Sequence, residues 1–311
     1  MSLIVTGTIG IDTVHTPTGS VEEVPGGSCA YFAAAASSYT STRLVAAVGD
    51  DWPEGHRDLL SSFSGIDMAG LETRVGSKTF RWGGRYLENL NDRETLFTDI
   101  GVLAEAPPAI PEAFRDSQVV FLANTHPSVQ LGFLEHLPER RFTVADTMDL
   151  WINTAKDELL NLLSVIDGVV INDSEALLLT GIRNPIDAAR AIMKLGPSVV
   201  VVKKGEHGAV LASGDELAVL PAYPADAAQV VDPTGCGDSF AGGMMGWLAA
   251  RSRWDFPELQ TAIAWGTVSA SFTLGAFALD GLRDLDMSVI EQRMIDYQAA
   301  ARVGEQASVR T

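Results

Sequence analysis

The chain has 311 residues, of which 46% are hydrophobic and 20% charged, so it can bury a large core as one domain or as a domain with an appendage. Its formal net charge of −18 argues against non-specific binding to nucleic acid or to an anionic membrane surface. Two cysteines far apart, Cys29 and Cys236, indicate neither a disulfide framework nor a zinc site. The start MSLIVTGTIG has no basic segment and no cleavage site, so we expect a mature, cytoplasmic protein.

Short β-branched runs alternate with amphipathic stretches along most of the chain. Strands are expected at 2–7, 118–123, 141–146, 168–173 and 198–205, where continuous apolarity is typical of strands buried on both faces. Helices are expected at 126–137, 154–165 and 185–196, the last with Pro185 in its first turn. This alternation predicts an α/β fold with a doubly wound, mainly parallel central sheet flanked by helices. No linker divides the sequence, so we expect a single domain over residues 1–311.

Two segments depart from this alternation. Residues 11–24 and 72–100 are too polar for the central sheet and resemble β-ribbons. The second carries turn signals at Gly76, Gly83–Gly84 and Asn91–Asp92. We expect the two segments to form a small sheet that projects from the large one and covers a site.

The uncharged segment 261–279 is nearly long enough to span a bilayer. It is rich in Ala, Gly, Ser and Thr and has no flanking basic cluster. We therefore predict a closely packed, buried helix and no membrane contact.

Sites in doubly wound folds lie beyond the carboxyl ends of the strands, and three common motifs are missing there. The first strand ends in TGTIGID, which lacks the G-x-G-x-x-G pattern of dinucleotide-binding folds. Neither a P-loop nor the G-x-S-x-G elbow of hydrolases occurs in the sequence.

The stretch VVDPTGCGDSF, residues 230–240, carries the strongest chemical signal. A helix that begins near Gly235–Gly237 would point free backbone N–H groups and its positive dipole end at an anion. Asp238 in the first turn would then serve as a general base for an attacking hydroxyl. Alternatively, Asp238 is only an acid favoured by the helix dipole, and the glycines form a tight turn.

The segment VDPTGCGDSFAGG resembles the signature of the ribokinase-like, or PfkB, carbohydrate and nucleoside kinases. VPGGSCAYFAAAAS, VINDSEALLLTG and VVVKKGEHGA resemble three further motifs of that family, in the same order, so the resemblance spans nearly the whole chain. It implies that the polar segments form the family's β-sheet lid and that Asp238 is the catalytic base. It also implies an anion hole made by the backbone of Gly235, Cys236 and Gly237.

On the acceptor side, the resemblance assigns Asp12, Gly26 and Gly27 to the substrate's hydroxyl groups, with a plain turn as the alternative for the glycines. Ribokinases carry a sugar-binding Asn where this chain has Tyr31, which argues against ribose itself. Lid aromatic and basic residues could stack on a sugar or base or meet an anionic group, although packing or a dimer contact is the commoner role of such aromatics. These residues are Trp82, Arg85 and Tyr86.

On the nucleotide side, the resemblance implies that Asn172 and Glu175 place the phosphates and a hydrated Mg²⁺, with helix capping as the rival role. The nucleotide would be bordered by Lys203, Lys204, Gly205 and Gly208, and Lys204 could equally be a solvated lysine at a strand end. Asp232 and Thr234 match positions that bind a monovalent cation such as K⁺ in some members. Pro233 replaces the usual Thr of the signature and stiffens the turn.

The sequence thus predicts an ATP- and Mg²⁺-dependent kinase that phosphorylates a hydroxyl of a sugar or nucleoside, and a homodimer through the lid. A first alternative is another small alcohol, such as a phosphosugar bound by Arg74, Arg81 or Arg85, an inositol or a vitamin precursor. A second is a non-catalytic nucleotide- or sugar-binding regulator, which would have no need of Asp238 as a base.

Overall fold

Nine strands form the large sheet in the computed structural model, which describes residues 1–302. From one edge to the other they are β13 (Glu216–Leu220), β12 (Ala209–Ser213), β11 (Val199–Lys203), β10 (Gly168–Asn172), β9 (Phe142–Asp146), β8 (Val119–Leu122), β1 (Leu3–Thr6), β4 (Thr42–Gly49) and β5 (Ile66–Arg74). Within this sheet the pairs β11–β12 and β12–β13 are antiparallel, and the other neighbours are parallel. The predicted mainly parallel sheet is confirmed, and each of the five expected strands lies in it.

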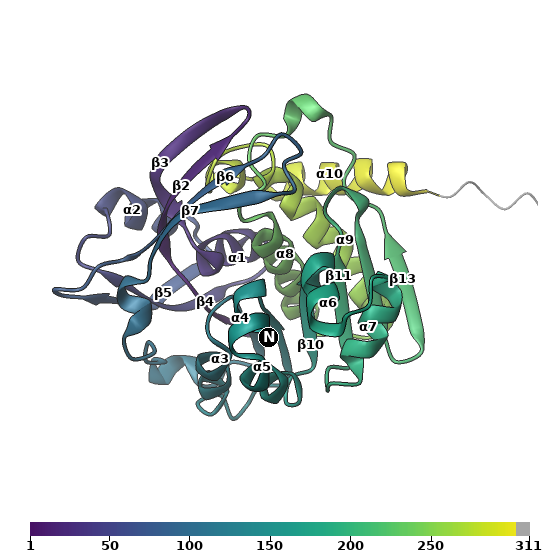
Figure 1. Cartoon of the computed structure of the whole chain (residues 1–311), viewed down its shortest axis with the longest axis horizontal. Coiled ribbons are helices and arrows are strands. Elements are labelled where there is room, and N and C mark those ends of the chain that lie inside the picture. Colours follow the sequence, from purple (N-terminus) through teal and green to yellow (C-terminus); the bar gives the residue numbers. More distant parts are fainter. Residues whose placement is uncertain (303–311) are drawn as a thin grey trace, which may run out of the picture.

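Helices cover both faces of this sheet (Figure 1). One face carries α1 (Ser28–Ser37), α2 (Glu54–Ser62), α8 (Cys236–Arg251), α9 (Phe256–Thr273) and α10 (Met287–Ala301). The other carries α3 (Pro127–Leu134), α4 (Asp149–Thr154), α5 (Lys156–Leu163), α6 (Asp173–Thr180) and α7 (Pro185–Met193). Alternate residues of a strand serve the two cores: Leu3 and Val5 face the first set, and Ile4 faces the second. This two-sided burial explains the continuous apolar runs.

A separate sheet of four strands has the order β3-β2-β6-β7. It is built from β2 (Gly10–Thr16), β3 (Gly19–Gly26), β6 (Phe80–Tyr86) and β7 (Arg93–Asp99), and it lies at the upper left of Figure 1. Every residue of β7 is exposed. The two polar segments of the sequence therefore pair with each other, as predicted, and we call this unit the small sheet.

The second polar segment differs from its prediction in two places. Glu72–Arg74 end β5 at the edge of the large sheet, where they pair with residues 47–49 of β4. Gly83 and Gly84, predicted as a turn, lie within β6 instead. The rings of Phe97 and Trp82 occupy the space that side chains at these two positions would need. The glycines therefore make room for aromatic packing and a local bulge.

The uncharged segment forms most of α9, which ends at Thr273, and its residues pack against α8 and α10. Glycines of α8 permit this close packing, because side chains at Gly242 and Gly243 would strike α1 and α9. No helix within residues 1–302 is long and apolar enough to cross a membrane.

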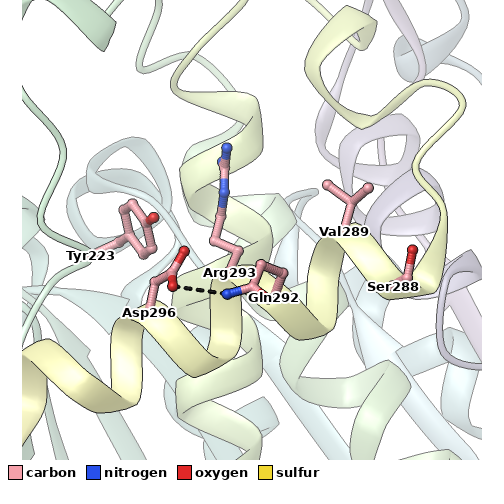
Figure 2. Close-up of a pocket in the computed structure, with 6 residues that line it drawn as sticks. All are labelled: Tyr223, Ser288, Val289, Gln292, Arg293 and Asp296. Carbon is pink, nitrogen blue, oxygen red and sulfur yellow. Dashed lines mark hydrogen bonds between the residues drawn. The ribbon is translucent and has the colours of Figure 1, made fainter.

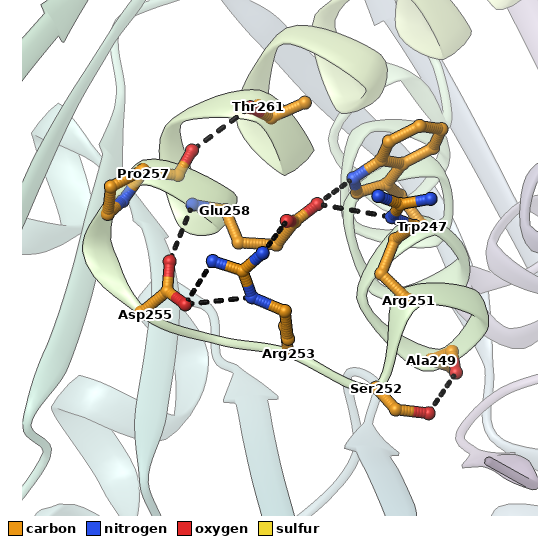
Figure 3. A network of polar contacts seen from close by, with 9 residues as sticks. All are labelled: Trp247, Ala249, Arg251, Ser252, Arg253, Asp255, Pro257, Glu258 and Thr261. Carbon is orange, nitrogen blue, oxygen red and sulfur yellow. Dashed lines mark hydrogen bonds and ion pairs between the residues drawn. The ribbon is translucent and has the colours of Figure 1, made fainter.

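A polar network joins the far end of α8 to the start of α9 (Figure 3). Trp247 Nε1 donates a hydrogen bond of 2.6 Å to Glu258 Oε1, and the Trp247 ring stacks on Trp265. Arg251 Nε and Arg253 Nη1 lie 3.9 and 3.8 Å from the Glu258 carboxylate. Glu258 is buried, so this network fixes the helix that carries residues 236–238 at its opposite end.

Candidate active site

The carboxyl ends of the parallel strands bring the predicted residues to one edge of the large sheet. Asn172 ends β10 and pairs directly with Lys203, which ends β11. Asp146 ends β9, the next strand along. Parallel strands place such end residues together at one edge, and the first turn of α8 lies beside them.

Helix α8 begins as the sequence predicts, with Gly235 as its N-cap at a φ of 74°. Non-glycine residues rarely adopt this conformation, and a side chain here would also strike the ring of Tyr31. The N–H of Cys236 donates to the carbonyl of Pro233 at 3.2 Å. Within the described part of the chain, the N–H groups of Gly235 and Gly237 have no backbone acceptor. Of the three backbone N–H groups predicted to form the anion hole, those of Gly235 and Gly237 are therefore free to donate to a ligand.

Asp238 stands half-buried in this first turn. Burial raises the pKa of its carboxyl, and the nearby positive charges of Lys203 and Arg93 act in the opposite direction. Lys203 and Arg93 favour the ionised form of this carboxyl, which is the form that a general base needs. The electrostatics are thus compatible with the role that the sequence assigned to Asp238.

Asp146 is a site residue that the sequence analysis missed. Burial raises its pKa well above the ordinary value, and the charge of Asp238 raises it further. Its Oδ1 is buried without a hydrogen-bond partner. Nothing but its place at a strand end distinguishes this aspartate in the sequence, and that place could have identified it.

Of the residues predicted to bind the acceptor, Asp12 of β2 lies against Gly26 of β3 and near the start of α1. The Asp12 carboxyl fills the space that a side chain at Gly26 would need. Gly27 caps α1 at a φ of 92°, and a side chain there would strike the Thr8 carbonyl. Burial raises the pKa of Asp12 to about 7. The glycines therefore keep the backbone bare beside a buried carboxyl.

Tyr31 does not project into this space as a free side chain. It is buried and packs against Gly235. Burial, followed by the charges of Asp12 and Asp232, raises the pKa of its hydroxyl. Tyr31 thus lies between Asp12 and residues 232–237, the segment that leads into α8 and that we call the anion loop.

Asn172 and Glu175 form a capping box at the start of α6. Asn172 Oδ1 accepts from the N–H of Glu175 at 2.8 Å, and Glu175 Oε2 accepts from the N–H of Asn172 at 2.9 Å. Burial raises the pKa of Glu175. The capping role that the sequence left open is therefore present.

The predicted nucleotide loop follows β11. Lys204 donates its N–H to the carbonyl of Gly208 at 2.7 Å, which closes a tight turn around Gly205. The side chain of the neighbouring Lys203 points toward α8. Its Nζ lies 2.8 Å from the position of a Cβ built on Gly237. Lys203 is thus the lysine that the structure brings to Asp238.

Asp232 and Thr234 lie just before α8. The N–H of Thr234 donates to Asp232 Oδ1 at 2.8 Å, while Asp232 Oδ2 is buried without a partner. Asp12 and Asp146 carry similar unpartnered oxygens. A buried polar atom without a partner costs free energy, so these three carboxylates carry oxygens that the protein's own described residues leave unsatisfied.

The small sheet contacts this region directly. The hydroxyl groups of Tyr86 on β6 and Thr234 lie 3.2 Å apart. Arg93 on β7 places its guanidinium 5.6 Å from the centre of the Trp82 ring. Arg85 pairs with Glu94. It is the neighbour of Tyr86 in the strand and therefore lies on the opposite face of the small sheet, away from Thr234. The expectation that Arg85 meets an anionic group of the acceptor is therefore corrected.

A separate hollow of about 340 Å³ lies between α10 and the loop after β13. Figure 2 shows its lining, which contains Arg293, Gln292, Asp296 and Tyr223. The Arg293 guanidinium lies over the rings of Phe272 and Tyr223. None of the predicted site residues lines this hollow.

Comparisons with known proteins identify the family of this chain. The model of the pfkB family of carbohydrate kinases matches residues 4–280. A cytidine kinase from Thermococcus kodakarensis is 34% identical over 259 residues, covering 81% of this chain and 89% of its own length. The chain is also similar to the solved structure of a Burkholderia thailandensis nucleoside kinase in complex with ADP-inosine, with a TM-score of 0.77, 15% identity and full coverage of both chains.

A third similar structure is an Escherichia coli protein described as a putative ribokinase II, in complex with ATP and Mg²⁺. It has a TM-score of 0.74 and 18% identity, and the match covers 94% of this chain and 99% of that one. Fold and family agree with the sequence motifs. The chain belongs to the pfkB family of carbohydrate kinases and is an ATP-dependent carbohydrate or nucleoside kinase.

Proposed function

We propose that this kinase transfers the terminal phosphoryl group of ATP to a hydroxyl of a nucleoside, with Asp238 as the general base. The observation that supports this most is the first turn of α8, where Asp238 stands beside free backbone donors and Lys203. The 34% identity to a cytidine kinase favours a nucleoside, and cytidine in particular, as the acceptor.

In this proposal the acceptor lies against the bare backbone of Gly26 and Gly27, and Asp12 accepts hydrogen bonds from its hydroxyl groups. Asp238 takes the proton of the attacking hydroxyl. The N–H groups of Gly235 and Gly237 hold the charge that develops on the phosphoryl oxygens. Cys236 would join them only if its N–H left the Pro233 carbonyl.

The donor nucleotide would lie along the ends of β10 and β11, bordered by Lys204, Gly205 and Gly208. Magnesium binds proteins through few carboxylates and keeps several waters. Glu175 of α6 and Asp146 at the end of β9 would hold such an ion, because the buried Oδ1 of Asp146 has no hydrogen-bond partner that a cation would have to replace. Bound there with Asn172 nearby, Mg²⁺ would neutralise charge on the nucleotide's phosphates.

A monovalent cation such as K⁺ would satisfy the unpartnered Oδ2 of Asp232. This residue precedes α8 by a short turn that Thr234 helps to close. A cation here would hold the anion loop in place without contacting the reacting groups. If a monovalent cation binds here, adding K⁺ to an assay buffer prepared without Na⁺ or K⁺ should raise the activity.

The small sheet would act as a lid that excludes water from the phosphoryl group. Leu96 and Phe97 on its outer strand β7 are each 41% exposed, and unpaired apolar edge strands favour pairing with another chain. We therefore propose a homodimer through the small sheet. Light scattering on the native protein, and on a Leu96→Glu variant expected to be monomeric, tests this assignment.

Acceptor-dependent ADP release with Mg-ATP tests the proposed function. The panel would contain cytidine, other nucleosides, ribose, phosphosugars and inositols at equal concentrations. Preferential turnover with nucleosides supports the proposal. Preferential turnover with a free sugar or a phosphosugar would move the acceptor class away from nucleosides. Binding of nucleotide without turnover on any acceptor would favour a non-catalytic regulator.

A further inference from the structure

The hairpin of β6 and β7 spans the candidate site from one side to the other. At the end of β6, the Tyr86 hydroxyl meets the hydroxyl of Thr234 in the anion loop at 3.2 Å. At the hairpin tip, Asn91 Oδ1 lies 3.5 Å from the position of a Cβ built on Gly205 in the nucleotide loop. The residues between these two contacts therefore pass over the gap between the anion loop and the nucleotide loop.

The strand register decides which of these residues face the site. Tyr86 pairs directly with Arg93 across the hairpin, and directly opposed residues share one face of a sheet. Tyr86 is buried toward the anion loop, so Arg93 faces the same way. Arg85 and Glu94 pair on the other face.

Arg93 carries a charge that the protein itself leaves unpaired. Within residues 1–302 it forms no ion pair, and its side chain is exposed above the Trp82 ring. Its positive charge nevertheless acts on the half-buried carboxyl of Asp238. Burial raises the pKa of Asp238, and Arg93 is among the charges that oppose this shift.

We propose that Arg93 is a catalytic residue of this kinase, which binds the transferred phosphoryl group from the small-sheet side, opposite the backbone donors of α8. During transfer the bond from the acceptor oxygen to phosphorus forms while the bond from phosphorus to the bridging oxygen of ATP breaks. Asp238 takes the acceptor's proton, and negative charge moves to the ADP leaving group. Arg93 gives and takes no proton, and its guanidinium stabilises the charge on the phosphoryl oxygens in the transition state.

This inference rests on the proposed function, and its test separates the two. The variants are Arg93→Gln, Arg93→Lys and Arg93→Ala, with Arg85→Gln on the opposite face as the control that removes the same charge from the same hairpin. We expect Arg93→Gln to lower kcat by about 100-fold or more, with the KM for the nucleoside within a few-fold of native. Arg85→Gln should retain native kcat.

Two further readouts distinguish catalysis from a structural role. Free guanidinium ion at low millimolar concentration should restore part of the kcat of Arg93→Ala and leave Arg85→Gln unchanged. ADP with aluminium fluoride, a mimic of the transition state, should bind native protein more tightly than ADP alone in the presence of the nucleoside, and Arg93→Ala should lose this gain. The Tm of each variant should stay within about 2 °C of native, because both side chains are exposed.

Native protein that turns over no acceptor would refute the proposed function before Arg93 is tested. Native protein that turns over, together with an Arg93→Gln variant of native kcat, would refute the role of Arg93 alone. A rise in the nucleoside KM at unchanged kcat would also overturn it, because Arg93 would then bind the acceptor rather than the phosphoryl group.

Discussion

The ammonium group of Lys203 lies 2.8 Å from the place where a Cβ on Gly237 would stand. This relationship joins the end of β11 to the first turn of α8. It places one positive charge beside Asp238, Asp146 and Glu175, whose carboxyl pKa values burial raises. The Lys203 side chain therefore occupies the space that a side chain at position 237 would need.

Replacing Lys203 with Met should shift the pH dependence of the kinase. Burial raises the pKa of Asp238, and Lys203 is the strongest influence that lowers it. Without this charge the base stays protonated to higher pH, so the acidic limb of kcat/KM should move to higher pH. Profiles of native, Lys203→Met and Lys204→Met enzyme check this, because Lys204→Met should alter ATP binding and leave the limb in place. A limb that does not move in Lys203→Met would contradict the assigned electrostatics.

Substituting Gly235 with Ala should damage both stability and activity. The residue has a φ of 74°, and the added methyl group would also strike the Tyr31 ring. Gly214 offers a matched control, because its φ is 58° and nothing lies within 4 Å of an added Cβ. Gly214→Ala should cost about 1 kcal/mol of unfolding free energy, and Gly235→Ala clearly more. Equal losses in urea unfolding would mean that Tyr31 moves aside freely.

Much of the fold was predictable because a strand that is buried on both faces consists of a continuous run of apolar residues. Runs such as residues 199–202 are continuously apolar, since alternate side chains enter different cores. The start of α8 was predictable because glycines and an acid at a helix start have few other uses. The positions of Gly83 and Gly84 were not, because a pair of glycines signals a turn as readily as it makes room for the Phe97 and Trp82 rings.

The site was harder to predict where it depends on register between distant segments. Two adjacent lysines gave no sign that Lys203, rather than Lys204, turns toward Asp238. Arg93 is one of several exposed arginines in a polar segment, and only its pairing with Tyr86 reveals which face it occupies. Asp146 has no motif of its own, and its place at the end of β9 becomes informative only once β9 is known to neighbour β10.

The unliganded protein should lose stability as pH rises through the range in which Asp12 titrates. Burial raises its pKa from 3.8 to about 7, so between these values the folded state binds more protons than the unfolded state. Stability therefore falls from about pH 4 to pH 7 on account of this group and levels off above it. Asp12→Asn should raise the Tm at pH 8 by several degrees and have little effect at pH 4. If Asp12→Asn has the same Tm as the native protein at pH 8, the buried Asp12 carboxylate does not destabilise the folded state, and the prediction is wrong.

The network at the far end of α8 should contribute stability without contributing chemistry. Trp247→Phe keeps the ring against Trp265 but removes the 2.6 Å hydrogen bond to Glu258. Because Glu258 is buried, the lost bond should cost about 1–3 kcal/mol of unfolding free energy. Thermal or urea unfolding measures this loss, and kcat at 25 °C should stay near native. A large fall in kcat with unchanged stability would show that the network acts on the active site.

The central claim is that Asp238 deprotonates the acceptor beside the anion loop, and one comparison tests it most directly. Acceptor-dependent ADP release with Mg-ATP and the preferred nucleoside would be measured for native protein and for Asp238→Asn, with binding of each ligand followed by calorimetry. We predict that kcat falls by about 100- to 10,000-fold in the variant while both ligands still bind. An Asp238→Asn variant that turns over as fast as the native protein would contradict the assignment.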